Sequence, residues 1–238
     1  MKGRRCAVAS CGQPVGGHSK HCEAHKRTLR RHGHAEQKGV TVYELSAFKE
    51  GVERRRAKNP GNPTWSLLEG RWLALTGHAE ATMNSYSTGA ASITHERATA
   101  ALLLRLRDTV PASAVINTAL AMVSMEEQRP SRFRSDRAFL FELARRVRGL
   151  ADVAAGSRWS PVESRMKRTY SEVPPRVLEC LGASLQAAFG VAGMRLAALD
   201  KQDADGVQAE RVELHDALRK MTCRRQQARC SRRVAPSE

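Results

Sequence analysis

Three cysteines and one histidine near the start of the chain restrict its fold more than any other feature of the sequence. Cys6 and Cys11 are separated by four residues, Cys22 and His25 by two, and ten residues lie between the two pairs. Three thiolates and one imidazole can complete a tetrahedral zinc shell. The loop between the pairs is rich in glycine and proline, which form tight turns and let the pairs meet. The sequence therefore predicts a Zn²⁺ site formed by Cys6, Cys11, Cys22 and His25.

The spacing leaves two alternatives open. In the first, the cysteines are unrelated thiols in a flexible basic leader. In the second, another histidine replaces His25 as the fourth ligand. Four histidines lie close enough in sequence to do so, namely His18, His21, His32 and His34. His25 is preferred because it forms a close pair with Cys22, and each such pair can supply two ligands from one turn.

A cluster of cations follows the last predicted ligand. If a helix starts near Cys22, four basic residues lie along its exposed side, namely Lys26, Arg27, Arg30 and Arg31. Such a row suits the phosphates of a nucleic acid. We therefore predict that these four side chains bind nucleic acid.

The same segment carries a resemblance. Cys6-x4-Cys11 with Gly12-Gln-Pro14, and Cys22-x2-His25 with Arg30-Arg31-His32-Gly33, resemble a small zinc finger at the start of many bacteriophage and mobile-element proteins. Some of those proteins are HNH-type nucleases. The resemblance covers only residues 1–35, for which it implies zinc and nucleic acid. The family often has an aromatic residue after the histidine, where this chain has Lys26, so a possible stacking group is missing.

The net charge of +16 is concentrated at the two ends of the chain. Residues 1–35 carry +7 and residues 219–238 carry +6, whereas residues 36–218 carry only +3. Basic ends on a nearly balanced body suit a polyanionic partner, although each end can also serve as a solubilising tail. We therefore expect a zinc finger over 1–35, a body over 36–218 and a basic tail over 219–238.

Two further groups of arginines are candidates for phosphate contact. The first is a basic turn that contains Arg132 and Arg134, and a solvated surface is an equal alternative for this region. The second lies in the C-terminal tail and comprises Arg224, Arg225 and Arg229. The tail loses its apolar pattern after Arg219, so we expect it to be frayed.

The composition of the body predicts an all-α fold of several helices. Aromatic residues make up only 5% of the chain, while alanine and leucine are plentiful. Apolar residues recur every three or four positions, and the stripe that contains Trp65 and Trp72 is predicted to lie in the core. Residues 83–92 are expected to form a loop, and Gly190 and Gly193 to bend or break a helix. Helix starts are predicted from capping residues at Thr41, Asn62, Ser135, Ser160 and Asp205.

Three observations favour a cytoplasmic, nucleic-acid-associated protein. The sequence shows no apolar run long enough to span a membrane. The first residues are basic but lack the apolar core of a secretory signal. The cysteines outside the finger are scattered, which indicates a reducing compartment.

We therefore expect a zinc-dependent accessory or regulatory protein of a phage or mobile element, which binds DNA or RNA. The sequence contains no glycine-rich phosphate loop, nucleophile elbow or His-Glu-x-x-His motif, which disfavours an enzyme. The first alternative is an HNH-like nuclease or recombinase-associated enzyme with its metal site in or near the finger. The second is a helical interaction scaffold whose last helix pairs with a protein partner or a second copy.

Overall fold

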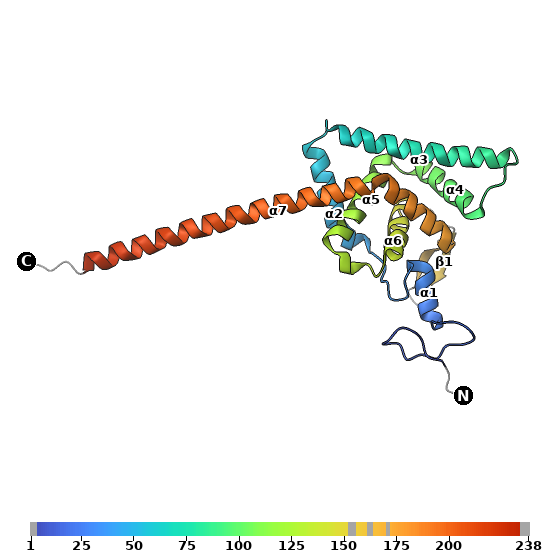
Figure 1. Cartoon of the computed structure of the whole chain (residues 1–238), viewed down its shortest axis with the longest axis horizontal. Coiled ribbons are helices and arrows are strands. Elements are labelled where there is room, and N and C mark those ends of the chain that lie inside the picture. Colours follow the sequence, from blue (N-terminus) through green and yellow to red (C-terminus); the bar gives the residue numbers. More distant parts are fainter. Residues whose placement is uncertain (1–3, 152–155, 161–163, 170–171, 234–238) are drawn as a thin grey trace, which may run out of the picture. The chain divides into compact units, whose positions relative to one another are not determined.

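The computed structural model is all-α apart from one short hairpin (Figure 1), as the sequence predicts. It describes residues 4–151, 156–160, 164–169 and 172–233, and the side chains of 156–158, 165, 167–169 and 223–233 are outside the described set. The chain divides into two compact units, Met1–Leu196 and Ala197–Glu238. The predicted boundary between body and tail, at residues 218 and 219, lies inside the second unit.

The finger segment contributes one helix, and the body contributes most of the others. In chain order the elements are α1 (Glu23–His32), α2 (Val42–Lys58), α3 (Pro63–Ser87), α4 (Thr94–Thr109), α5 (Ala112–Gln128), the 3₁₀ turn η1 (Pro130–Arg132), α6 (Asp136–Arg148), β1 (Gly156–Ser160), β2 (Arg165–Thr169) and α7 (Pro175–Arg233). β1 and β2 form an antiparallel pair in which Gly156 lies opposite Thr169.

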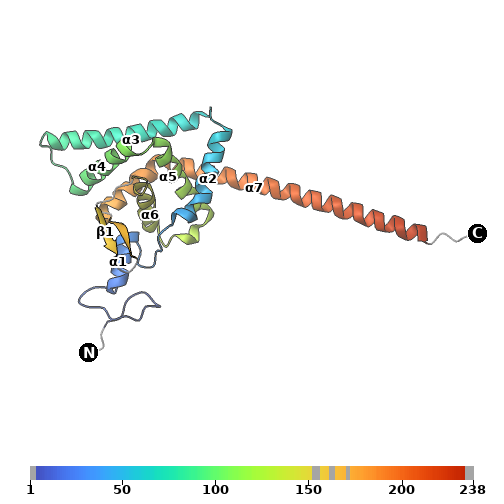
Figure 2. The ribbon, with the colours of Figure 1, turned by 180° about the vertical axis from the view of Figure 1, so that it is seen from behind.

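Helix α5 is the centre of the body. All of its residues from Val115 to Met125 are buried, so the helix is covered on every side rather than along one stripe. α2, α3 and α6 pack against it, and α4 packs against α3 (Figures 1 and 2). The first half of α7 completes this core through Leu181, Leu185 and Phe189, whose side chains are fully buried.

Three predicted helix starts are confirmed. The Thr41 hydroxyl accepts from the Glu44 amide at 3.1 Å, and the Glu44 carboxylate accepts from the Thr41 amide, which completes a capping box. Asn62 caps α3 by accepting from the Thr64 amide at 2.9 Å. Ser135 caps α6 by accepting from the Ala138 amide at 3.1 Å. The predicted tryptophan stripe is also in the core, since Trp72 is buried and Trp65 is packed against it.

Two predictions in the middle of the chain are wrong. α3 continues to Ser87, so the loop expected from residue 83 begins only at Thr88. Ser160 does not cap a helix, because it is the last residue of β1 and pairs with Arg165. The rest of the predicted capping box, residues 161–163, lies outside the described residues. A Ser-Pro-x-Glu pattern can start a helix, but here strand pairing decides the local structure.

Several predictions for the last part of the chain are also wrong, because α7 is continuous from Pro175 to Arg233 and is broken at neither Gly190 nor Gly193. Asp205 lies inside this helix and caps nothing. The residues from Arg219 to Arg233 are helical rather than frayed. Gly193 serves close packing instead of a break, since an added Cβ would lie 2.5 Å from Cβ of Val123 on α5.

One part of α7 is apolar enough to be compared with a membrane span. An 18-residue window in this helix has a mean hydropathy of 1.4 and satisfies the length and composition of a span, contrary to the expectation from the sequence. Of that window, 44% is buried inside the protein. Leu178, Leu181 and Leu185 account for much of its apolar character, and all three belong to the core.

Candidate metal centre

A short loop places the first two cysteines side by side. The Cys6 amide donates to the Gln13 carbonyl at 2.9 Å, and the Val15 amide donates to the Arg4 carbonyl at 2.9 Å, which pairs the two arms of the loop. Within the turn, the Cys11 amide donates to the Val8 carbonyl at 3.0 Å. The turn also needs Gly12, whose φ of 60° is unfavourable for other residues.

The second ligand pair lies at the start of α1. Cys22 is the residue immediately before the helix, and its carbonyl accepts from the Lys26 amide at 2.8 Å. His25 follows three residues later, so one helical turn brings both side chains to the same side. A hydrogen bond of 2.8 Å from the Ala7 amide to the Lys20 carbonyl holds the loop against this helix start.

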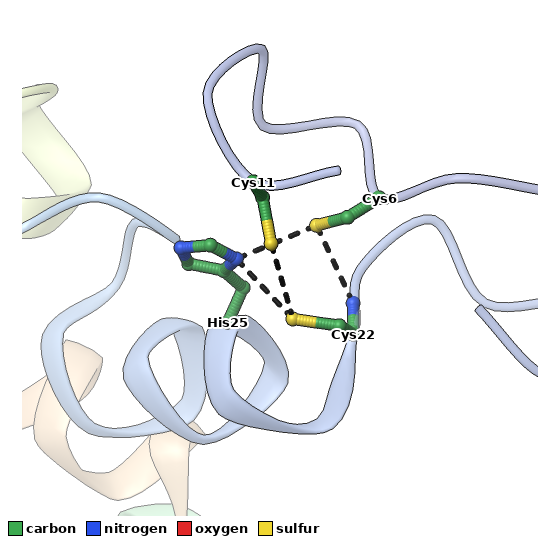
Figure 3. Close-up of side chains that lie close together, drawn as sticks. All are labelled: Cys6, Cys11, Cys22 and His25. Atoms are coloured by element: carbon green, nitrogen blue, oxygen red, sulfur yellow. Dashed lines mark hydrogen bonds between the residues drawn. The ribbon is translucent and has the colours of Figure 1, made fainter. Parts of the chain in front are cut away.

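The four side chains converge on one point (Figure 3). Their ligand atoms, three Sγ and the Nδ1 of His25, all lie within 4.8 Å of one another. The Sγ atoms of Cys11 and Cys22 are 3.7 Å apart, and His25 Nδ1 lies 3.3 Å from Cys22 Sγ and 3.4 Å from Cys6 Sγ. This Cys₃His cluster can hold a metal ion.

The separations fit the dimensions of a tetrahedral zinc shell. Zn–S bonds of about 2.3 Å and a Zn–N bond of about 2.0–2.1 Å would place the sulfur atoms about 3.8 Å apart, and sulfur and nitrogen about 3.6 Å apart. The observed distances of 3.7 Å and 3.3–3.4 Å are close to both values. All three cysteines are free thiols, so no disulfide competes for the sulfur atoms.

The surroundings of Cys6 favour its thiolate, the form that binds metals. Burial raises the pKa of this thiol. Hydrogen bonds from the backbone of Cys22 and Val8 and from the side chains of His21 and His25 lower the pKa, and together they outweigh the effect of burial. The resulting pKa of Cys6 is about 6, against an ordinary value of 9.0. The Cys22 amide is one of these donors, at 3.4 Å from Cys6 Sγ.

Among the described residues, His25 is the histidine that completes the cluster. His32 instead contacts Glu142, with Nδ1 at 2.5 Å from Oε1. The ring of His34 accepts from the Glu36 amide at 3.2 Å. His18 is exposed, and His21 lies outside the group of converging ligand atoms. The structure thus brings together the four residues predicted as ligands.

Three of the four predicted nucleic-acid-binding residues of α1 form one exposed face. Arg27, Arg30 and Arg31 are exposed and are spaced three and four residues apart, which places them on one side of the helix. Arg31 also donates to Glu172 at 3.2 Å in an exposed ion pair. Lys26 is partly buried, and its ammonium pairs with Glu23 at 2.6 Å. We call Arg27, Arg30 and Arg31 the arginine face.

The structure gives Arg132 an internal role. Its guanidinium donates to both carboxylate oxygens of Glu44, at 2.5 and 3.0 Å, and to the Lys38 and Gly39 carbonyls at 3.0 Å. Since these bonds occupy its donors, Arg132 is poorly placed for a phosphate. Arg134 is exposed. The remaining candidates, Arg224, Arg225 and Arg229, lie on α7 with side chains outside the described residues.

Sequence reasoning missed the junction that joins the finger to the body. Glu142 on α6 is fully buried, and its two oxygens contact His32 at the end of α1 and accept from the Val40 amide at 2.7 Å. Gly33 ends α1 with φ of 75°, where an added Cβ would lie 2.8 Å from the Arg137 carbonyl oxygen. The only local signal was the position of Glu142, three residues after the buried Phe139, on the apolar side of α6.

Comparisons with known proteins give no relative. No family model, no curated protein and no solved structure matches the chain. The function is therefore inferred from the chemistry of its own residues.

Proposed function

We propose that the protein is a zinc-dependent nucleic-acid-binding protein in which the metal holds a basic helix in position for phosphate contact. DNA is the first target to test and RNA the second. Because the N-terminal segment resembles the zinc finger of phage and mobile-element proteins, we also propose an accessory or regulatory role in a phage or mobile element. We propose that the protein acts in the cytoplasm.

Zinc is the metal that this donor set favours. Three thiolates and an imidazole in a tetrahedral arrangement are typical of structural zinc sites. A shell that is filled by four protein ligands has no open position for water or substrate. Its role in the proposal is therefore to fix the loop and the start of α1, and it supplies no reaction chemistry.

The observation that carries the proposal is the arginine face directly beside the metal cluster. His25 is a ligand, and Arg27 follows two residues later on the same helix, so metal binding fixes the orientation of these cations. Arg30 and Arg31 lie in the last turn of α1, where positive side chains also offset the negative end of the helix dipole. An exposed row of arginines on a rigid helix can contact phosphates or reach base edges.

The test is a salt titration of binding to a DNA duplex and to a single-stranded RNA, followed by fluorescence anisotropy. The triple variant Arg27→Ala/Arg30→Ala/Arg31→Ala should bind more weakly and with a shallower salt dependence. The slope of log affinity against log salt should fall by about 0.9 for each duplex phosphate that is no longer neutralised. A matched control is Arg54→Ala/Arg105→Ala/Arg195→Ala, which removes three exposed arginines elsewhere in the body. Equal slopes for wild type and the triple variant would contradict the proposal.

The nuclease alternative is addressed by a separate assay. An HNH-type core needs a metal-binding histidine and a general-base histidine on a hairpin and helix, whereas the sequence from Gly156 to Thr169 contains no histidine. Incubation of the zinc-loaded protein with supercoiled plasmid and added Mg²⁺ or Mn²⁺ should leave the plasmid intact. Metal-dependent nicking that is lost on chelation would favour the nuclease instead.

A further inference from the structure

The second compact unit of the protein exposes an apolar row that has no partner among the described residues. Every side chain from Lys201 to Thr222 is exposed. Val207, Leu214, Leu218 and Met221 are large apolar residues in this stretch, with exposed fractions of 50–63%. Helices in water gain most of their stability from packing of an apolar face. A partner on this face would therefore stabilise the helix.

The spacing of the row is that of a coiled-coil seam. Starting at Ala204, the steps along the helix are three, four, three, four and three residues, which is the alternation that keeps a seam facing one partner helix. The seam comprises Ala204, Val207, Arg211, Leu214, Leu218 and Met221. We call these six residues the α7 seam. Val212 is also apolar and exposed, but it lies beside Arg211 and outside this spacing.

The charges along α7 determine which orientation of a second copy is favourable. Residues 200–216 contain six acidic and two basic residues, a net charge of −4. Residues 219–233 contain seven basic residues and no acidic one. Two copies in parallel would place acidic on acidic and basic on basic. In an antiparallel pair centred between Val212 and Glu213, residues 200–206, with three acidic and one basic residue, lie beside the partner's residues 219–225, with four basic residues and no acidic one, which is complementary.

The residues of the α7 seam favour the same orientation. In a parallel pair, identical positions meet, so Arg211 would face the partner's Arg211 in the seam. In an antiparallel pair centred between Val212 and Glu213, Arg211 faces the partner's Leu214 instead. Small and large residues then also meet, because Ala204 faces the partner's Met221. The antiparallel seam uses all six residues and leaves no like charges face to face.

We propose that the α7 seam forms an antiparallel coiled coil with the α7 seam of a second copy of this chain. The facing pairs are Ala204 with the partner's Met221, Val207 with the partner's Leu218, and Arg211 with the partner's Leu214. The inference goes beyond the proposed nucleic-acid binding and does not depend on it.

The association is tested by sedimentation equilibrium of the full-length protein over a range of micromolar concentrations. Wild type should be a dimer, and Leu218→Lys should raise the dissociation constant about a hundredfold, because each dimer then places two lysines in the seam and each costs about tenfold. Val212→Lys is the matched control and should leave the dimer intact. A wild type that stays monomeric throughout, or equal effects of the two lysines, would overturn the proposal.

The orientation is tested by disulfide cross-linking of the zinc-loaded protein with Cys180, Cys223 and Cys230 replaced by serine. On that background, Ala204→Cys and Met221→Cys are made as separate proteins. A mixture of the two should form a mixed disulfide under mild oxidation, whereas neither alone should cross-link efficiently. Efficient cross-linking of each protein alone would demonstrate parallel helices and overturn the antiparallel arrangement. Circular dichroism, with the same helix content in every variant, verifies folding.

Discussion

At the scale of single residues, Cys11 is the proposed ligand whose replacement tests the metal assignment most directly. We expect wild type to purify with one zinc per chain and Cys11→Ser to lose most of it, because the serine hydroxyl is not a zinc ligand of comparable strength. The measurement is elemental analysis of the purified proteins. Cys180→Ser is the control and should retain a full equivalent, since Cys180 lies on α7 outside the cluster. Wild type without zinc would contradict the metal assignment.

Glu142 is the residue whose replacement should weaken the junction between finger and body. Glu142→Gln keeps the shape of the side chain but replaces one carboxylate oxygen with a donor NH₂, so His32 no longer contacts a carboxylate. We expect the free energy of unfolding to fall by about 1–3 kcal/mol, as for a buried charged hydrogen bond. Urea unfolding measures it. Glu36→Gln, at an exposed site between α1 and α2, should change stability by less than about 0.5 kcal/mol.

The role of Cys11 could be predicted from the sequence, whereas the role of Glu142 could not. Cys11 belongs to a motif completed within 20 residues, so the spacing alone predicted the cluster. The hydrogen bond between His32 and Glu142 joins residues 110 positions apart in the chain. No local sequence pattern predicts a contact between residues so far apart. The role of a glutamate on an apolar helix face can be identified only once the element that packs against it is known.

At the scale of elements, the start of α2 depends on an ion pair with η1. The pKa of Glu44 is held below its ordinary value of 4.5, chiefly by the hydrogen bond from Arg132, against the opposing effect of burial. A carboxylate with a lowered folded-state pKa adds stability above the unfolded-state pKa, and this stability is lost as the pH falls through the folded-state value. The pair should therefore stabilise the protein at neutral pH and cease to do so in acid.

Glu44→Gln tests this dependence by urea unfolding at a series of pH values. The variant should be less stable than wild type at neutral pH, and the difference should shrink as the pH falls below 4.5. Glu50→Gln, on the same helix but exposed, is the control and should follow the wild-type curve. A difference that is constant with pH would show that the cost comes from packing or the cap, and not from the charge.

The predicted helix starts are correct where the capping interaction joins residues that are close together in the sequence. Thr41, Asn62 and Ser135 cap their helices through bonds to residues two or three positions away, and a sequence pattern contains both partners. Ser160 has the same kind of pattern, but its neighbours pair across a hairpin. Asp205 stands before Gly206, which costs a helix only about 1 kcal/mol, and the long helix continues through both.

At the scale of the whole molecule, the finger and the body should respond differently to metal removal. The small core of the finger consists of Cys6, Val8, Cys22 and Ala35, two of which are proposed zinc ligands, whereas the body has a large apolar core of its own. Chelation should therefore increase amide hydrogen exchange in residues 4–35 and leave α5 and α6 protected. Loss of protection throughout the body would mean that the core depends on the metal.

Nucleic-acid binding should draw on both ends of the chain. Residues 1–35 carry +7 and residues 219–238 carry +6, around a body of only +3. Arg224→Gln/Arg225→Gln/Arg229→Gln retains helix-forming residues and removes three charges. If these arginines neutralise phosphates, the salt slope of duplex binding should flatten by about 0.9 for each phosphate released, and all sequences should weaken alike because phosphates carry no base information.

Any preference for a particular sequence should instead change with the arginine face. α1 carries two of the proposed metal ligands, Cys22 before its first residue and His25 within it, and its end contacts the body through His32 and Glu142, so its arginines can be held against base edges in a defined register. Anisotropy titrations of two unrelated duplexes separate the contributions. Loss of the α7 arginines should lower both affinities by the same factor, whereas loss of the arginine face should also change their ratio. A ratio that changes only with the α7 variant would move sequence recognition to the C-terminal helix and refute the assignment to the finger.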